Sequence, residues 1–124
     1  MANKKSIGTW LLILLVALPV GAAGIGKLMG VEMMHQSFQL MGMPEWFGYF
    51  IGACELAGAL GLFIPLLSSA AASGLLAIML GAVGFHMAFT PLSLGVPALV
   101  LAALAVVIVF ARRNESFWFP GAQA

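Results

Sequence analysis

Four stretches of almost uninterrupted apolar residues dominate this chain. They cover residues 7–29, 46–64, 70–89 and 94–111, and turn-forming residues separate them. Each is about 20 residues long, the length that an α-helix needs to cross the hydrocarbon core of a bilayer. Only 7% of the 124 residues are charged, whereas soluble domains carry about 25%. The sequence therefore predicts an all-α integral membrane four-helix bundle that forms a single domain over residues 1–124.

Basic residues indicate how this bundle is oriented in the bilayer. Lys4 and Lys5 precede the first apolar stretch, and Arg112 and Arg113 follow the last one. Because cytoplasmic flanks are enriched in Lys and Arg, both ends are expected in the cytoplasm, which requires an even number of crossings. The N-terminal run also has features of a signal peptide. At about 22 residues, however, its apolar part is long enough to span, so we expect the helix to be retained.

The loop between the first two stretches has a helical pattern of its own. Val31, Met34, Phe38 and Met41 recur at helical spacing, while polar residues occupy another face. This pattern predicts a short amphipathic helix in the outer interface. Methionine and histidine in this segment are ligand types that suit Cu(I), but the methionines already serve the apolar stripe. No metal site is therefore expected.

Small residues spaced four apart indicate tight helix packing. In lipid, such pairs let helix backbones approach closely, which favours a compact bundle. The pairs are Gly26 and Gly30, Gly48 and Gly52, Ala57 and Gly61, and Ala77 and Gly81.

Three ionisable side chains fall within or at the edge of the predicted spans: Lys27, Glu55 and His86. A carboxylate near the middle of a span is costly in lipid, so Glu55 is expected to face the bundle or a wet cavity. Lys27 and His86 are expected nearer the outer side, about 10–13 Å above the midplane. Together the three residues predict a polar pocket that opens outward, as a ligand or proton site.

Each of these residues also has an interpretation without function. Lys27 can extend its amine to the outer headgroups, and Glu55 can be a protonated or hydrogen-bonded packing residue. His86 can make a hydrogen bond within the bundle. Cys54, next to Glu55, points about 100° away around the helix and is expected to pack as a small apolar residue.

Several function classes find no support in the sequence. The net charge is +1, so nothing indicates a nucleic-acid partner, and one cysteine permits neither a zinc motif nor an internal disulfide. No hydrolase, metalloprotease, phosphate-loop or dinucleotide motif is present, which favours an accessory membrane subunit over a stand-alone enzyme. These absences leave quinone binding open, because a quinone needs only an apolar cleft with a few polar groups.

The order of several short motifs resembles the DoxX-like family of small bacterial membrane proteins. The motifs are Gly26-Lys27-Leu28 with Gly30, the loop end Leu40-Met41-Gly42-Met43-Pro44, Glu55-Leu56-Ala57-Gly58, Pro65, and residues 82–86 ending in His86. The resemblance covers nearly the whole chain. It implies a four-helix protein of the bacterial inner membrane, in a group with members linked to thiosulfate:quinone oxidoreduction and to membrane oxidoreductase complexes. Lys27, Glu55 and His86 match polar positions of the family pattern.

Three functional hypotheses follow. The leading one is an accessory subunit of a membrane redox system, which handles a quinone or binds a membrane or soluble oxidoreductase through Glu55. The second is a membrane assembly or chaperone-like partner without chemistry, in which glycine faces bind other helices or a second copy of the chain. The third, ranked last, is a small proton-coupled transporter. Carriers of that kind have their essential glutamate in the first helix, where this chain has none.

Overall fold

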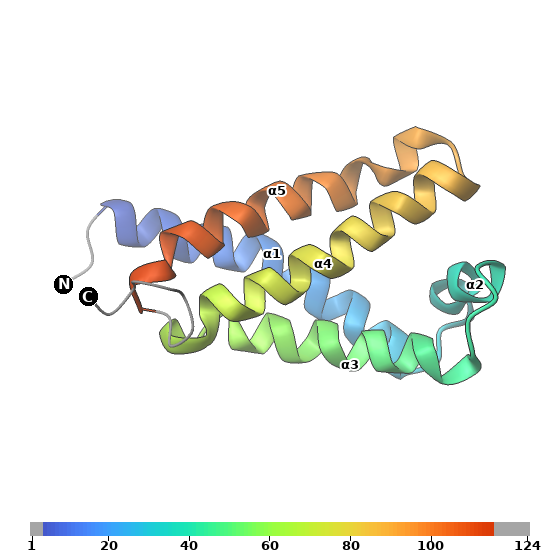
Figure 1. Cartoon of the computed structure of the whole chain (residues 1–124). Coiled ribbons are helices and arrows are strands. Elements are labelled where there is room, and N and C mark those ends of the chain that lie inside the picture. Colours follow the sequence, from blue (N-terminus) through green and yellow to red (C-terminus); the bar gives the residue numbers. More distant parts are fainter. Residues whose placement is uncertain (1–3, 116–124) are drawn as a thin grey trace.

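The computed structural model describes residues 4–115, and within this range it contains only helices and turns (Figure 1). The first helix begins and the last one ends at the same end of the molecule, which we call the Arg112 end. The second helix lies at the opposite end, called the α2 end. The α-helices are α1 (Lys4–Leu28), α2 (Glu32–Leu40), α3 (Glu45–Gly61), α4 (Pro65–Phe89) and α5 (Val96–Ala111), and the 3-10 helices are η1 (Leu92–Gly95) and η2 (Arg113–Glu115).

The all-helical fold class is confirmed, and three helices are long and apolar enough to cross a membrane. They are Ser6–Leu28, Pro65–Phe89 and Leu92–Ala111. The remaining long helix, α3, has 17 residues and is therefore only about 25 Å long, against a hydrocarbon core of about 30 Å. The prediction of four spans is thus supported by length and composition for three of them.

The start of α4 differs from the sequence-based prediction. Residues 65–69 were expected to form a turn, but they form the first turn and a half of α4. Pro65 occupies the first helical position, where its fixed φ is suitable and its missing N–H would have no partner within the helix. Ser69 and Ser73 fit the helix because their hydroxyls donate to the carbonyls of Val109 and Ser69, at 3.0 and 2.9 Å.

The long helices pack mainly as two pairs, α1 with α3 and α4 with α5. Smaller contacts between α3 and α4 and between α1 and α5 join the pairs. The buried core lies between the pairs and is aliphatic, with Ile13, Val16 and Val20 from α1 and Leu75 and Ile108 from α4 and α5. In Figure 1 the two pairs diverge toward the α2 end, where α4 and α5 lie above and α1 and α3 lie below.

The contact between α1 and α3 depends on two glycines. A Cβ on Gly24 would lie 2.8 Å from the carbonyl oxygen of Gly52. A Cβ on Gly52 would lie 2.7 Å from the Cβ of Lys27 and 2.9 Å from the carbonyl oxygen of Gly24. The two backbones are therefore in direct contact here, as small residues permit in membrane helices. By contrast, a Cβ on Gly81 of α4 would have no neighbouring atom within 4 Å.

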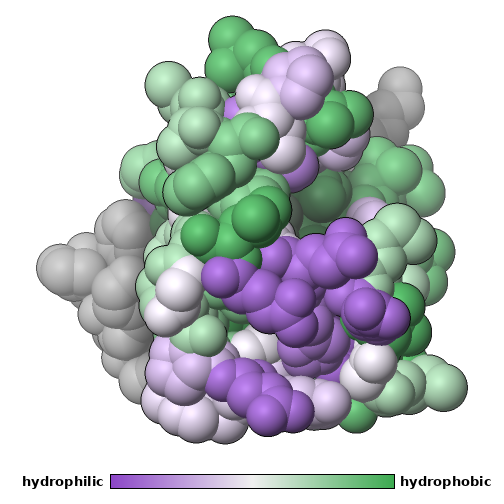
Figure 2. Space-filling model, turned by 90° about the vertical axis from the view of Figure 1, so that its right-hand side faces the viewer, coloured by the Kyte–Doolittle hydropathy of each residue, from purple (hydrophilic) through white to green (hydrophobic). Residues whose placement is uncertain are grey.

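Most of the outer surface is apolar, with large side chains such as Leu18, Leu80 and Leu99 exposed along the long helices. Polar side chains gather instead at the α2 end, where Figure 2 shows a hydrophilic area bordered by hydrophobic surface. Exposed Glu32 and Gln36 on α2 belong to this end. An apolar belt with a polar end is the surface expected of a protein whose solvent is largely lipid.

The glycine contact predicts a difference between two identical substitutions. Gly52→Ala places a methyl group against the α1 backbone and should lower the free energy of unfolding by about 1–3 kcal/mol. Gly81→Ala adds the same methyl group in open space, and should leave stability unchanged or raise it by up to about 1 kcal/mol through helix propensity. Thermal or denaturant unfolding in detergent micelles measures both. Equal effects of the two substitutions would contradict the direct backbone contact.

Candidate functional site

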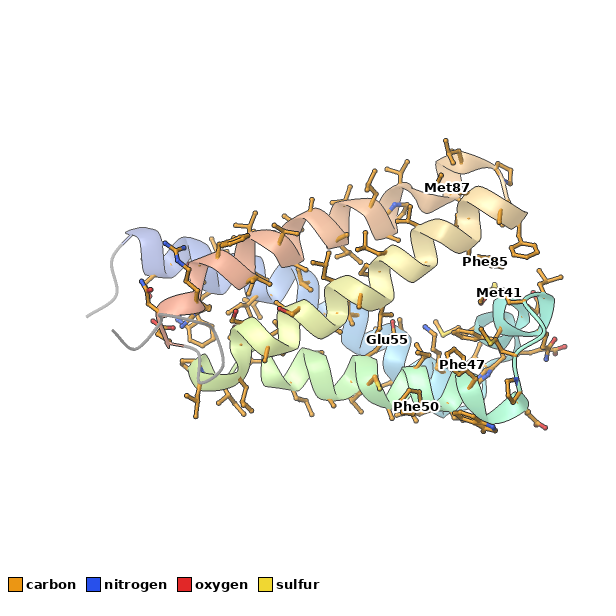
Figure 3. All side chains as sticks on the ribbon, in the orientation of Figure 1. Met41, Phe47, Phe50, Glu55, Phe85 and Met87 are labelled. Carbon is orange, nitrogen blue, oxygen red and sulfur yellow. The ribbon has the colours of Figure 1, made fainter. Side chains whose placement is uncertain are left out.

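Glu55 lies on the face of α3 that carries the small residues. Gly52 precedes it by three residues and Ala59 follows it by four, so the three share one helix face. The Glu55 side chain is only 3% exposed. In Figure 3 it points from α3 into the molecule, whereas Phe50 of the same helix points outward. A carboxylate buried to this extent requires a charged or hydrogen-bonding partner.

Lys27, in the last turn of α1, is that partner. Its Nζ lies 2.7 Å from Oε1 of Glu55, and its side chain is 14% exposed. The sequence predicted that the two residues lie at different depths in the bilayer. The structure shows how they meet: the Cβ of Lys27 lies directly over Gly52, so its side chain can extend along α3 to Glu55, about one helical turn away.

Oε1 of the carboxylate contacts the ammonium of Lys27 at 2.7 Å, and among the described residues no further hydrogen-bond donor reaches this oxygen. Burial of two charges costs several kcal/mol of desolvation, which their attraction offsets only when the remaining polar atoms are also satisfied. Each carboxylate oxygen has two lone pairs, so Glu55 can accept a further donor in addition to Lys27.

His35 of α2 connects this pair to the α2 end. Its Nε2 lies 2.8 Å from the carbonyl oxygen of Lys27. Since a carbonyl oxygen only accepts, Nε2 carries the hydrogen. The ring of His35 packs 4.5 Å from that of Tyr49, in the space left by the absent side chain of Gly48. His35 therefore holds α2 against both α1 and α3.

A cleft of about 380 Å³ opens beside His35, between the end of α1, α2 and the start of α3. Glu32 and Glu45 contribute carboxylates to its lining, and Phe38 and Tyr49 contribute aromatic rings. Gly30 also lines it and adopts a φ of +77°, a conformation that glycine favours and that turns the chain from α1 into α2. His35 lines this cleft and also bonds to the backbone carbonyl of Lys27, so it links the cleft to the end of α1.

His86 lies apart from the other two predicted residues. Its Nδ1 is 2.9 Å from Oγ1 of Thr90, and Thr90 donates back to the carbonyl oxygen of His86 at 3.1 Å. The ring packs beside Gly95 at the turn between α4 and α5. Among the described residues, no hydrogen bond or ion pair joins His86 to Lys27 or Glu55. The structure thus brings together two of the three predicted residues and places the third in a local cluster of its own.

His35 and Tyr49 were not predicted as site residues. His35 was interpreted within a methionine-rich segment. One available signal was the small-residue face of α3, which continues beyond Gly52 to Gly48. The contact with α1 occupies the surface at Gly52, which leaves the surface at Gly48 for a bulky side chain from another segment. In the structure that side chain is His35.

Three apolar helices, a lipid-compatible surface and a buried ion pair define a small helical membrane protein. The sequence pattern of the DoxX-like family matches residues 11–109, which include both Lys27 and Glu55. The chain belongs to the DoxX-like family. Searches among curated proteins and among solved structures gave no match.

Proposed function

We propose that this DoxX-like protein is an accessory subunit of a membrane redox system, and that the Lys27–Glu55 pair is its functional centre. The observation that carries the proposal is the ion pair itself, in which a carboxylate only 3% exposed contacts the Lys27 ammonium at 2.7 Å. Ionisable residues inside membrane segments are costly, and they most often mark ligand or proton sites. The family resemblance favours redox systems as the setting.

The small molecule proposed here is a quinone, bound in the neighbouring cleft beside His35, which Lys27 and Glu55 do not line. A quinone head group needs an apolar cleft and a few convergent polar groups. The cleft beside His35 offers the rings of Phe38 and Tyr49 together with the Tyr49 hydroxyl. His35 also bonds to Lys27. Because the acceptor is the backbone carbonyl of Lys27, occupation of the cleft can shift the end of α1 that carries the Lys27–Glu55 pair. A protein subunit that inserts a side chain here would use the same contacts.

The proposal places four helices across a bacterial inner membrane, with both ends in the cytoplasm. Although α3 is short, Leu62, Phe63 and Ile64 continue its apolar stretch up to Pro65, so the segment from α3 to α4 can still cross. The cleft and α2 then lie on the outer side, with α2 in the membrane interface.

Reporter fusions test this arrangement. A green fluorescent protein fused after Ala124 should fluoresce, and alkaline phosphatase fused there should be inactive, because that end lies in the cytoplasm. Phosphatase inserted between Gly42 and Met43, in the turn after α2, should be active. An active phosphatase at the C-terminus would contradict four crossings with both ends inside.

A second candidate function, a membrane assembly partner without chemistry, is favoured by one face of α4. Gly74, Ala77, Gly81 and Gly84 follow one another at helical spacing and are all exposed. Nothing lies within 4 Å of a Cβ placed on any of the three glycines. In lipid, such a face is suited to close approach by another helix.

One co-purification experiment distinguishes the two functions. The full-length protein, Glu55→Gln, Gly81→Leu and the control Cys54→Ser are purified in mild detergent, and mass spectrometry identifies the proteins and lipids that accompany each. We expect a quinone or an oxidoreductase subunit with the unchanged protein and with Cys54→Ser. Its recovery should fall roughly tenfold or more with Glu55→Gln, because that change breaks the buried ion pair that holds Lys27, whose carbonyl positions His35 at the cleft.

The opposite pattern would support the assembly partner instead. In that case an unrelated membrane protein would accompany the unchanged chain and Glu55→Gln, and Gly81→Leu would lose it. Equal recovery of quinone and oxidoreductase with the unchanged protein and with Glu55→Gln would contradict the redox proposal.

A further inference from the structure

Arg112, directly after α5, is unusually well buried for an arginine at the end of a membrane helix. It is only 7% exposed, whereas its neighbour Arg113 is exposed. An arginine that merely extends to the membrane surface keeps its charged group in water. Here the guanidinium lies over the ring of Trp10 on α1, 4.7 Å from its centroid. The charge is thus held in a fixed place between the first and the last long helix.

The partners of this guanidinium leave it open to another anion. Nη1 pairs with Oε2 of Glu115 at 2.9 Å, but the Glu115 side chain is 52% exposed and therefore free to rearrange in water. Nε is buried and has no hydrogen-bond acceptor among the described residues. A planar guanidinium in this setting is suited to the oxygens of a phosphate group, which it binds in a bidentate manner.

A cleft of about 650 Å³ lies at this position, between the first turns of α1 and the end of α5. Its lining is divided by polarity. The polar end consists of Arg112, Arg113, Asn114 and the carboxylate of Glu115, with the hydroxyl residues Ser6 and Thr9 on α1. Apolar residues of α5 form the other part, namely Val106, Val107, Phe110 and Ala111. A polar end next to an apolar strip matches a phospholipid, with its phosphate on the arginines and an acyl chain along α5.

Charge complementarity indicates which phospholipids fit. Of the five Lys and Arg residues of the chain, Lys4, Lys5, Arg112 and Arg113 belong to this end, while three of its four acidic residues are the distant Glu32, Glu45 and Glu55. A basic cluster at a helix end attracts anionic lipids, at about 1 kcal/mol for each Lys or Arg near the surface. A zwitterionic lipid lacks the net charge on which this attraction depends.

We propose that the cleft at the Arg112 end binds the phosphate of an anionic phospholipid, with Arg112 and Arg113 as its ligands and the exposed α5 side chains as the seat of one acyl chain. The site lies at the opposite end of the molecule from α2 and the cleft beside His35, and it does not depend on the proposed redox function. The general bias of basic residues toward the cytoplasm does not by itself predict such a site. Here one buried arginine, Arg112, and one cleft are proposed to bind one lipid molecule.

Native mass spectrometry of the delipidated full-length protein tests the proposal. Phosphatidylglycerol, phosphatidylcholine or inorganic phosphate is added at the same concentration, and the bound fraction is measured. We expect one phosphatidylglycerol to bind at least tenfold more tightly than phosphatidylcholine, and inorganic phosphate not to displace it. Displacement by inorganic phosphate would mean a site for a free anion and would overturn the assignment to a lipid.

Two substitutions change the charge at the site in opposite directions. Arg112→Gln should weaken phosphatidylglycerol binding roughly ten- to a hundredfold, the usual effect of losing hydrogen bonds to a charged group. Glu115→Gln removes the competing carboxylate from an exposed position and should strengthen binding about three- to tenfold. This second variant keeps the test valid if Arg112→Gln does not fold, which circular dichroism and gel filtration will show. Unchanged affinity in Glu115→Gln, or equal binding of the two lipids, would overturn the proposal.

Discussion

The ion pair between Lys27 and Glu55 depends on one backbone contact, and the candidate site depends on that pair. Lys27 reaches Glu55 because Gly24 and Gly52 allow α1 and α3 to touch. In lipid a helix gains little from burying apolar residues against another helix, since the lipid tails are equally apolar. Close backbone packing and a buried charge pair are therefore interactions that can hold α1 and α3 in one specific register.

The same contact positions the cleft at the α2 end. Once α1 and α3 are fixed, the Lys27 carbonyl oxygen is available to His35, and Gly48 leaves room for the histidine ring. His35 thereby holds α2 against α1 and α3, although α2 is short and most of its side chains are exposed or half-buried. The cleft that the proposed function uses is formed by this attachment. Its aromatic and carboxylate lining is a consequence of where α2 is held.

Much of the fold could be predicted from the sequence because lipid imposes simple rules on length and polarity. The lengths of the apolar stretches predicted the long helices, and the cost of charge in lipid identified Lys27 and Glu55 as candidate site residues. Other features depend on packing that periodicity does not contain. The first turns of α4 at residues 65–69 are stabilised in part by Ser69, whose acceptor lies 40 residues away on α5. The meeting of Lys27 with Glu55, the role of His35 and the separate position of His86 likewise depend on which helix crosses which.

The most direct test of the account is a double-mutant cycle on the buried pair, with the free energy of unfolding measured in detergent micelles. Lys27→Met and Glu55→Leu are compared with the variant that carries both changes. The account predicts that each single change costs about 3–5 kcal/mol, because it leaves a buried charge without its partner. The double change should cost far less than the sum of the two. Small and additive costs would contradict the claim that this pair holds α1 and α3 together.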